Sequence, residues 1–311
     1  MRTLRLPAAA GSSRNRAVAA LAAAGVAWGT SVPLSKSALA WLPPAWLVVV
    51  RFAIAAAVLL ATVDRTALRA AFRAPVFGWG ALGLGGSVLV QNVGIGMTSV
   101  THASLLIGCG PVLVAVIAAL WHRAVARPVA WAGFALSLGG VAIVAGGQGG
   151  GASGAGDLIV LVSAMLAATL TVAQGRLLKD QVPAAITAVQ FLGAAIGALP
   201  VALITEGLPH APAAGGPGML AVLAVLGLAA VGTLAPFTLF AYGQHQVSTE
   251  VAGAFLNLEP LVGALAGVLA FGDPAGPRLA LGGVAILAGI AMSSLPALRA
   301  AEHKAALAAS G

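Results

Sequence analysis

Apolar segments of about 20 residues recur along the whole of this 311-residue chain, separated by short polar or Pro/Gly-rich breaks. A helix of about that length crosses the hydrocarbon core of a bilayer. The residues are 60% hydrophobic and only 8% charged, whereas a soluble domain carries roughly 25% charged residues. The chain is therefore predicted to be an all-α membrane protein that crosses the lipid bilayer many times.

The breaks give ten candidate transmembrane helices. Lysine and arginine concentrate in the cytoplasmic loops of membrane proteins. With the N-terminus inside, thirteen of the 16 basic residues lie on the cytoplasmic side, Lys36 and Arg278 lie outside, and Arg51 lies within the second helix. We therefore expect a multi-pass protein of the bacterial inner membrane with both termini in the cytoplasm. The ten helices are expected at residues 17–37, 44–63, 76–97, 101–121, 128–146, 157–177, 184–204, 218–242, 248–271 and 278–297.

The longest polar stretch is Gly-rich and lies between the fifth and sixth helices, where a flexible outer linker is expected. It separates two five-helix halves. The predicted organisation is a cytoplasmic N-terminal tail (1–16), a first repeat (17–146), the linker (147–156), a second repeat (157–297) and a cytoplasmic C-terminal tail (298–311).

The two halves can be superimposed in sequence. A shift of 149 residues places Pro111 on Pro260 and Pro128 on Pro277 without a gap, and two glycines and Ala103 also match. Near the start of each half the match is weaker, with Phe52 close to Phe191. Because each half has an odd number of helices, the second must be inserted upside down. Inverted repeats are typical of transporters, whose substrate site lies near the midplane between the halves.

Three stretches resemble a known family. The first helix contains W-G-T-S-V-P-L-S-K (28–36), the second contains R-F (51–52), and residues 240–273 end in N-L-E-P-L-V-G-A-L-A-G-V-L-A-F-G-D. Together they are similar to the EamA family of the drug/metabolite transporter superfamily. The first half departs from that pattern, because C-G-P-V (109–112) lacks the acid of L-E-P-L and W-H-R (121–123) replaces the usual G-E.

The resemblance implies ten helices in two inverted repeats around a central cavity, working by alternating access without ATP. The eight acidic residues are scattered and form no paired-acid or His-x-x-x-His motif, and no phosphate-binding loop is present, so we expect the protein to be neither an enzyme nor an ATP-driven pump and to need no cofactor or metal. Its substrates are expected to be small metabolites, with export of amino acids or related compounds common in the family. Efflux of cationic drugs and, more remotely, a lipid-modifying enzyme are the alternatives. We expect a monomer or a weak dimer.

Glu259 is the central candidate in the site, because it is the only acidic residue in the interior of a predicted span, away from the span ends. A buried carboxylate in a membrane costs several kcal/mol unless it is paired or wetted. Two roles stay open: Glu259 and Pro260 form a structural motif, or Glu259 contacts substrate or a proton. Arg51 is expected either to hold helix-end carbonyl groups or to attract a substrate carboxylate. The candidate substrate-binding residues are Trp28, Ser31, Arg51, Gln91, Asn92, Pro111, Gln174, Phe237, Tyr242, Phe255 and Glu259.

Four further residues receive structural predictions. Lys36, at a helix end, is expected to extend its ammonium group to the membrane surface. His102 is expected to be a solvated residue at a helix start, with pH sensing as the lesser alternative. Cys109 is expected to be a small core residue, and Asn257 to point away from Glu259. The net charge of +8 reflects cytoplasmic loops, since the basic residues form no cluster with aromatics that would bind nucleic acid.

Overall fold

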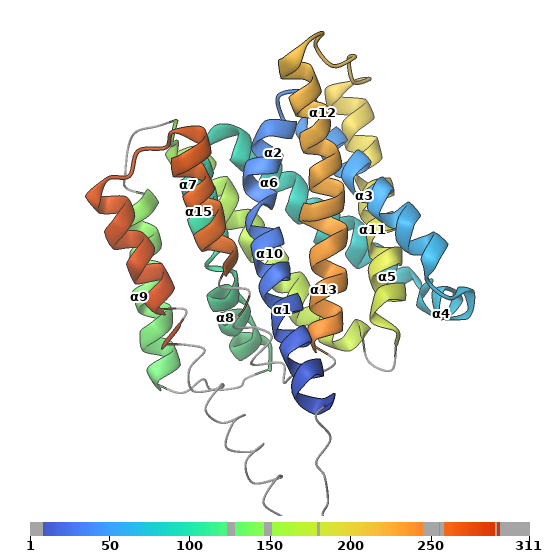
Figure 1. Cartoon of the computed structure of the whole chain (residues 1–311), viewed down its shortest axis with the longest axis horizontal. Coiled ribbons are helices and arrows are strands. Elements are labelled where there is room, and N and C mark those ends of the chain that lie inside the picture. Colours follow the sequence, from blue (N-terminus) through green and yellow to red (C-terminus); the bar gives the residue numbers. More distant parts are fainter. Residues whose placement is uncertain are drawn as a thin grey trace, which may run out of the picture.

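The computed structural model describes residues 9–122, 128–145, 151–178, 181–244, 255, 258–289 and 291–292. These residues form helices that stand side by side in one bundle (Figure 1). Six helices are long and apolar enough to cross a membrane: Asn15–Ala38, Pro44–Thr62, Ala74–Met97, Gly154–Gln174, Pro183–Glu206 and Gly216–Phe240. Shorter apolar helices lie at the four other predicted positions: Val100–Val114, Trp131–Val144, Leu258–Phe271 and Pro277–Gly289.

Several predicted spans consist of consecutive helical segments. The first half contains α1 (Ala9–Gly29), α2 (Ser31–Ala38), α3 (Pro44–Thr62), α4 (Arg65–Ala71), α5 (Ala74–Gly78), η1 (Trp79–Gly85), α6 (Gly86–Met97), α7 (Val100–Ile107), α8 (Gly110–His122) and α9 (Pro128–Ala145). The second half contains α10 (Gly154–Leu177), α11 (Pro183–Val201), η2 (Ala202–Glu206), α12 (Gly216–Ala229), η3 (Ala230–Leu234), α13 (Ala235–Gln244), α15 (Leu258–Phe271) and the helix Pro277–Gly289. The η segments are π-helical, a form that is often found at functional sites.

Proline and acidic side chains define where helices begin. Pro44, Pro128 and Pro183 each start a helix, a position where the missing N–H group costs nothing. At the start of α4, Asp64 Oδ2 accepts from the backbone N–H groups of Ala67 (3.0 Å) and Thr66 (2.9 Å). These hydrogen bonds lower the pKa of Asp64 from its ordinary value of 3.8.

The first turn of α3 is capped from the other half of the chain. The Glu206 carboxylate accepts from the backbone N–H of Ala45 (2.8 Å) and of Trp46 (3.0 Å). We expect Glu206→Gln to destabilise the protein by about 1 kcal/mol, the usual effect of losing a good helix cap. Thermal unfolding in detergent would measure the loss. Asp64→Asn, which alters a cap made within one short helix, is the control and should leave the contact between the halves intact.

Contacts between the halves come in equivalent pairs. Helix α3 packs on α11, its own repeat counterpart, and α7 packs on α15, a segment of the span that is matched with its own. The pair α1–α13 in the same way mirrors the pair α10–α6. Phe52 and Phe191, matched in sequence, lie with ring centroids 5.3 Å apart. Side chains that meet their own counterparts must lie close to the axis that relates the two halves.

Glycine contacts show this relation residue by residue. Gly94 packs against Val160 and the carbonyl of Gly156, and Gly243, which follows Gly94 by 149 residues, packs against Leu21 and the carbonyl of Ala17. Val160 and Gly156 each follow their counterparts, Leu21 and Ala17, by 139 residues. The same two contacts therefore occur twice, with the halves exchanged.

The last helices of the two halves pack against each other, and their contacts show in which direction each helix runs. Gly140 of α9 packs against the carbonyl of Gly282, and Gly289 packs against the carbonyl of Gly133. The two helices stand side by side at the edge of the bundle (Figure 1). Because the higher number in one helix meets the lower number in the other, they run antiparallel.

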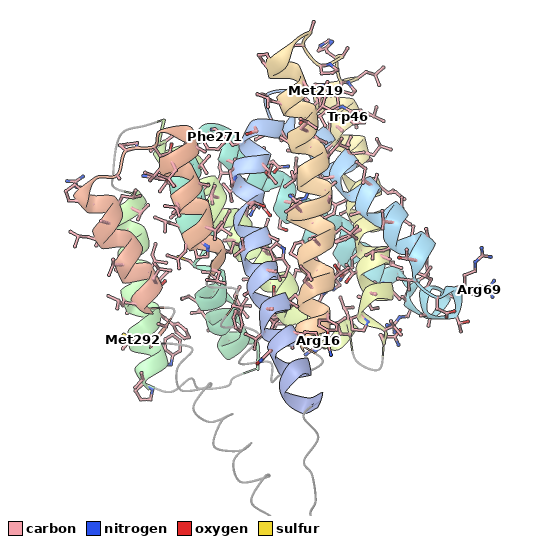
Figure 2. All side chains as sticks on the ribbon, viewed as in Figure 1. Arg16, Trp46, Arg69, Met219, Phe271 and Met292 are labelled. Carbon is pink, nitrogen blue, oxygen red and sulfur yellow. The ribbon has the colours of Figure 1, made fainter. Side chains whose placement is uncertain are left out.

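The ends of the bundle differ in charge, and its sides are apolar. Arg16 and Arg69 lie toward the same end as Met292, whereas Trp46, Met219 and Phe271 lie toward the opposite end (Figure 2). Large apolar side chains such as Leu82, Ile204 and Leu269 are at least 75% exposed on the sides of the helices. Such extensive apolar exposure suits contact with lipid, since soluble proteins rarely present large apolar patches.

Candidate functional site

The site forms around the guanidinium group of Arg51, which is 6% exposed. Its Nε donates to Thr233 Oγ1 at 2.6 Å, and its Nη2 donates to the carbonyl of Gly232 at 3.3 Å. Both acceptors belong to η3 of the second half. The arginine of α3 thus binds the π-helical segment across the boundary between the halves. The carbonyl it binds lies within the continuous helical stretch from α12 to α13 and not at a helix end.

The π-helical turn presents these acceptors. Thr233 Oγ1 also donates to the carbonyl of Leu228, five residues earlier, at 2.8 Å. Ser31 Oγ donates to the carbonyl of Gly232 at 3.1 Å. Gly232 itself packs against Ser31, where a Cβ would lie 3.1 Å from the hydroxyl oxygen. Segments α2 and η3 therefore approach closely, because position 232 has no side chain.

Part of the guanidinium has no protein partner. Arg51 Nη1 is buried and makes no hydrogen bond to any described residue. The nearest opposite charge that acts on Arg51 is Glu259, at the start of α15, and the two interact electrostatically. No direct ion pair joins them within the described residues. Two opposite charges in a desolvated interior are costly unless each is paired or hydrogen-bonded.

Aromatic rings extend from this group. Arg51 lies over the ring of Phe52, 5.2 Å from its centroid, a favourable position for a cation. Phe191 contacts both Phe52 (5.3 Å) and Phe237 (5.2 Å). Phe237 in turn contacts Trp28 edge-on at 5.3 Å. Rings from α1, α3, α11 and α13 thus form a continuous apolar wall beside the guanidinium.

Five of the predicted site residues are brought together in this way. They are Trp28, Ser31, Arg51, Phe237 and Glu259, from five different segments. Glu259 joins the group through its backbone, because Gly29 packs against the carbonyl of Glu259 and against Val262. Phe255, four residues before Glu259, makes a similar contact, because its carbonyl group lies against Gly25 of α1.

The other predicted residues lie elsewhere. Asn92 is fully buried, and its Nδ2 donates to the carbonyl of Pro44 at 3.2 Å, so it braces α6 against α3. Gln91 of α6 is partly buried. Tyr242 is 44% exposed on α13. Pro111 lies within α8, but its side chain, like the whole of Asn257, is outside the described part of the structure.

Gln174 belongs to a second, uncharged polar pair. Gln174 and Gln190 exchange two amide hydrogen bonds of 3.0 and 2.9 Å. Gln190 stands 139 residues after Arg51 and is its repeat counterpart. The two halves therefore carry equivalent polar positions, but only the position in the first half carries a charge.

A cavity of about 150 Å³ lies between η1, α8 and α10. It is lined by Trp79, Trp121, Val172, Ala173, Arg176 and Leu177. None of these residues belongs to the Arg51 group, so this cavity is not the predicted central one. We place the candidate site at Arg51, because buried and incompletely paired charge marks function in a membrane more reliably than empty space does.

Two predictions about single residues are wrong. Lys36 does not extend to the membrane surface: its Nζ donates to the carbonyls of Ile95 (2.7 Å), Gly96 (3.1 Å) and Thr98 (2.8 Å), which are the free acceptors at the end of α6. His102 is not solvated, since it is 9% exposed and its Nδ1 lies 2.9 Å from Asp157. In both cases a partner distant in sequence satisfies the polar group. The prediction for Cys109 is confirmed, because it is fully buried.

Sequence reasoning missed Thr233, Phe52 and Phe191 as members of the site. Thr233 resembles many other span hydroxyls that bond their own helix. The weak match of Phe52 with Phe191 was a usable signal, because counterparts near the axis of a repeat are expected to meet.

Comparison with known proteins places the chain in a family. The model of the EamA-like transporter family matches residues 15–146 and 154–295, one match for each half. A search of curated proteins returned no match. Among fifteen matching chains of solved structures, one described only as "Crystal structure of protein" is 24% identical, covers 91% of this chain and 98% of its own, and has a TM-score of 0.65. At that identity the likeness shows the fold alone. With both family matches, which cover most of its length, the chain belongs to the EamA-like transporter family.

Proposed function

We propose that this multi-pass transporter of the drug/metabolite type moves small metabolites by alternating access without ATP, exporting amino acids or related compounds. The observation that carries the proposal is the buried Arg51 guanidinium. It has one nitrogen without a partner in the described structure and lies within electrostatic reach of Glu259. A carboxylate on the substrate would complete the hydrogen bonding of Arg51, and an ammonium group would meet Glu259.

The exchanged contacts between the halves support this mechanism. Equivalent glycine contacts and the antiparallel pairing of α9 with Pro277–Gly289 fit two inverted five-helix repeats, and thus ten spans around a central cavity. In such transporters one repeat rocks against the other around a site near the midplane. Arg51 connects α3 of one repeat to η3 of the other, which is where such a site belongs.

The arrangement of charge supports the orientation. Arg16 and Arg69 lie toward one end of the bundle (Figure 2), and basic residues mark the cytoplasmic side. We place this end and both termini in the cytoplasm of a bacterial cell, with the protein in the inner membrane as a monomer or a weak dimer.

A dipolar substrate fits the site better than a simple cation. Glu259 and the rings of Trp28 and Phe237 could receive a cationic drug. The Arg51 charge, however, would repel it in a medium that screens charge weakly. Amino acids carry both charges and often an apolar side chain for the aromatic wall.

Uptake into proteoliposomes would test the proposal. Purified protein would be assayed with radiolabelled amino acids, quaternary amines and sugars, with and without a pH gradient. Saturable uptake of amino acids alone is the expected result. Saturable uptake of quaternary amines instead would show that the protein is a cation-efflux transporter. No uptake of any compound would contradict the proposed substrate class.

The role of Glu259 is tested in the same vesicles. We expect Glu259→Gln to lower amino-acid uptake at least about tenfold, since a buried charge contact contributes about 1.5–3 kcal/mol. Glu206→Gln, which removes a carboxylate that caps α3 outside the site, is the matched control and should preserve uptake. Normal uptake by Glu259→Gln would assign that acid a structural role.

A further inference from the structure

A second group of ionisable side chains lies apart from Arg51, where α6, α7 and α10 meet. His102 Nδ1 lies 2.9 Å from Asp157 Oδ2, and Thr98 Oγ1 donates to Asp157 Oδ1 at 2.6 Å. His102 is 9% exposed and Asp157 is 1% exposed. The histidine belongs to the first half and the aspartate to the second, so a shielded acid–base pair joins the two repeats.

A second acid–base pair reinforces the same junction. Lys36 holds the last carbonyl groups of α6, while Asp273 accepts from the backbone N–H of Thr101 in the first turn of α7 at 2.7 Å. Lys36 and Asp273 also interact electrostatically. Here too the base comes from the first half and the acid from the second. The turn between α6 and α7 is therefore held by opposite charges from both repeats.

Few other charges act on this junction. The described elements that pack against α7 include α2, α6, α9, α10, α15 and the helix Pro277–Gly289. Within them, α6 and α9 carry no charged residue. The charged residues of the others, with Asp273 in the turn after α15, are Lys36, Asp157, Arg176, Glu259, Asp273 and Arg278. Arg176 and Glu259 lie at the far ends of their helices from Asp157 and Asp273.

The equivalent positions of the two repeats carry no ionisable side chain. In the repeat alignment, the positions equivalent to Asp157, Thr98 and His102 are Val18, Val247 and Val251. All three counterparts are valine, which neither accepts nor donates a proton. The equivalent pairs α6–α10 and α13–α1 both pack together, so a group needed only to anchor these helices would be expected in both. The presence of the acid–base pair in only one of them indicates a role specific to that end.

We propose that the His102–Asp157 pair is the proton-binding site that couples transport to the pH gradient, an inference that rests on the alternating access proposed above. Neutral His102 donates its Nδ1–H to Asp157. A proton arriving from water at this end binds Nε2, and no other bond forms or breaks. The hydrogen bond then becomes an ion pair in a shielded setting and holds α7 against α10. Release of the proton weakens this contact and lets the end open.

Accessibility of a thiol beside the pair would test the inference without any substrate. Val160 is fully buried, packs against Gly94 and lies one turn from Asp157. Val160→Cys would be made in a Cys109→Ala background, and the full-length protein in nanodiscs would be labelled with a charged maleimide at about pH 6 and about pH 8. Because the thiol ionises more at the higher pH, every protein labels faster there, so the ratio of the two rates is compared between variants.

The expected labelling ratio depends on whether the side chain at position 102 can bind a proton. His102→Asn keeps a donor for Asp157 but cannot take up a proton, so its pH 8 to pH 6 labelling ratio should fall about tenfold below that of the His102 protein. His210→Asn, which alters an exposed histidine in the loop before α12, should keep the parental ratio. Equal ratios in His102→Asn and the parent would overturn the inference. Asp157→Asn serves as the second variant, with the same expectation, if His102→Asn does not fold.

Transport in vesicles separates this inference from the proposed function. Exchange of radiolabelled amino acids at equal concentration on both sides needs no gradient, so it should persist in His102→Asn, whereas uptake driven by a pH gradient should be lost. Gradient-driven uptake that persists in His102→Asn would also overturn the inference. Absence of amino-acid exchange in the parent protein, with the labelling difference intact, would contradict the proposed substrate and not the proton site.

Discussion

Arg51→Met is expected to lower the transport efficiency (kcat/KM) for amino acids about a hundredfold while leaving the protein folded. Methionine keeps an unbranched apolar side chain but removes the charge, its contact with the Phe52 ring and the hydrogen bonds to Thr233 and Gly232. Removing one partner of a buried charged contact costs about 2–5 kcal/mol, and about 2.8 kcal/mol corresponds to a hundredfold. Initial rates of radiolabelled uptake over a range of substrate concentrations would measure the loss.

The repeat supplies a matched control for this variant. Gln190 occupies the position equivalent to Arg51 and forms hydrogen bonds only with Gln174 among the described side chains. Gln190→Met therefore removes a buried polar group of similar location but no charge, and should retain most of the uptake. Arg51→Lys should fall between the two, because lysine keeps the charge but loses the planar fork. If the Arg51→Met protein took up amino acids within about threefold of the parent rate, Arg51 would not be part of the substrate-binding site.

Gly140→Val is expected to produce the largest loss of stability among single glycine changes in α9. A Cβ at position 140 would lie 2.6 Å from the carbonyl oxygen of Gly282 and 2.8 Å from the backbone nitrogen of Ile286. These are backbone atoms that cannot move aside, so the two helices must separate. Overpacking of this kind costs about 1–3 kcal/mol and sometimes more, and should lower the thermal unfolding midpoint in detergent by several degrees.

Adjacent and equivalent glycines make this test specific. A Cβ at Gly139 meets nothing within 4 Å, so Gly139→Val carries the same change in helix propensity without the clash. Gly289→Val should be as damaging as Gly140→Val, because position 289 is its repeat counterpart and a Cβ there would lie 2.6 Å from the backbone nitrogen of Ser137. Equal midpoints for the variants at positions 139 and 140 would show that the close approach does not exist in the protein.

Much of the architecture could be predicted from local patterns. Apolar segment length, the distribution of basic residues and the match of Pro111 with Pro260 depend on positions along the chain alone. They predicted the class of membrane protein, the position of the helices and the division into halves. The two family matches, over residues 15–146 and 154–295, confirm that the chain has two EamA halves. Helix ends were less accurate, since prolines such as Pro33 and the π-helical turns divide spans that hydropathy reads as continuous.

The site depends on contacts that no local pattern contains. Arg51 and Thr233 are separated by 182 residues in the chain, and Lys36 bonds carbonyl groups about 60 residues away. A polar residue in an apolar span must find a partner because water is absent, so the sequence could indicate that Arg51 and His102 matter. It could not indicate which distant group satisfies each of them, and the expectations for Lys36 and His102 failed for that reason.

The sequence by itself thus determined that this protein lies in a membrane, where its helices are and that it has two repeated halves, because hydrophobicity and spacing are properties of the chain. Only the tertiary structure decided which charges meet. It brought Arg51 to η3, left one of its nitrogens without a hydrogen-bond partner among the described residues and within electrostatic reach of Glu259, and joined His102 to Asp157 across the halves. Hydrogen bonds and ion pairs act over a few ångströms, and that proximity is set by the packing of helices far apart in sequence.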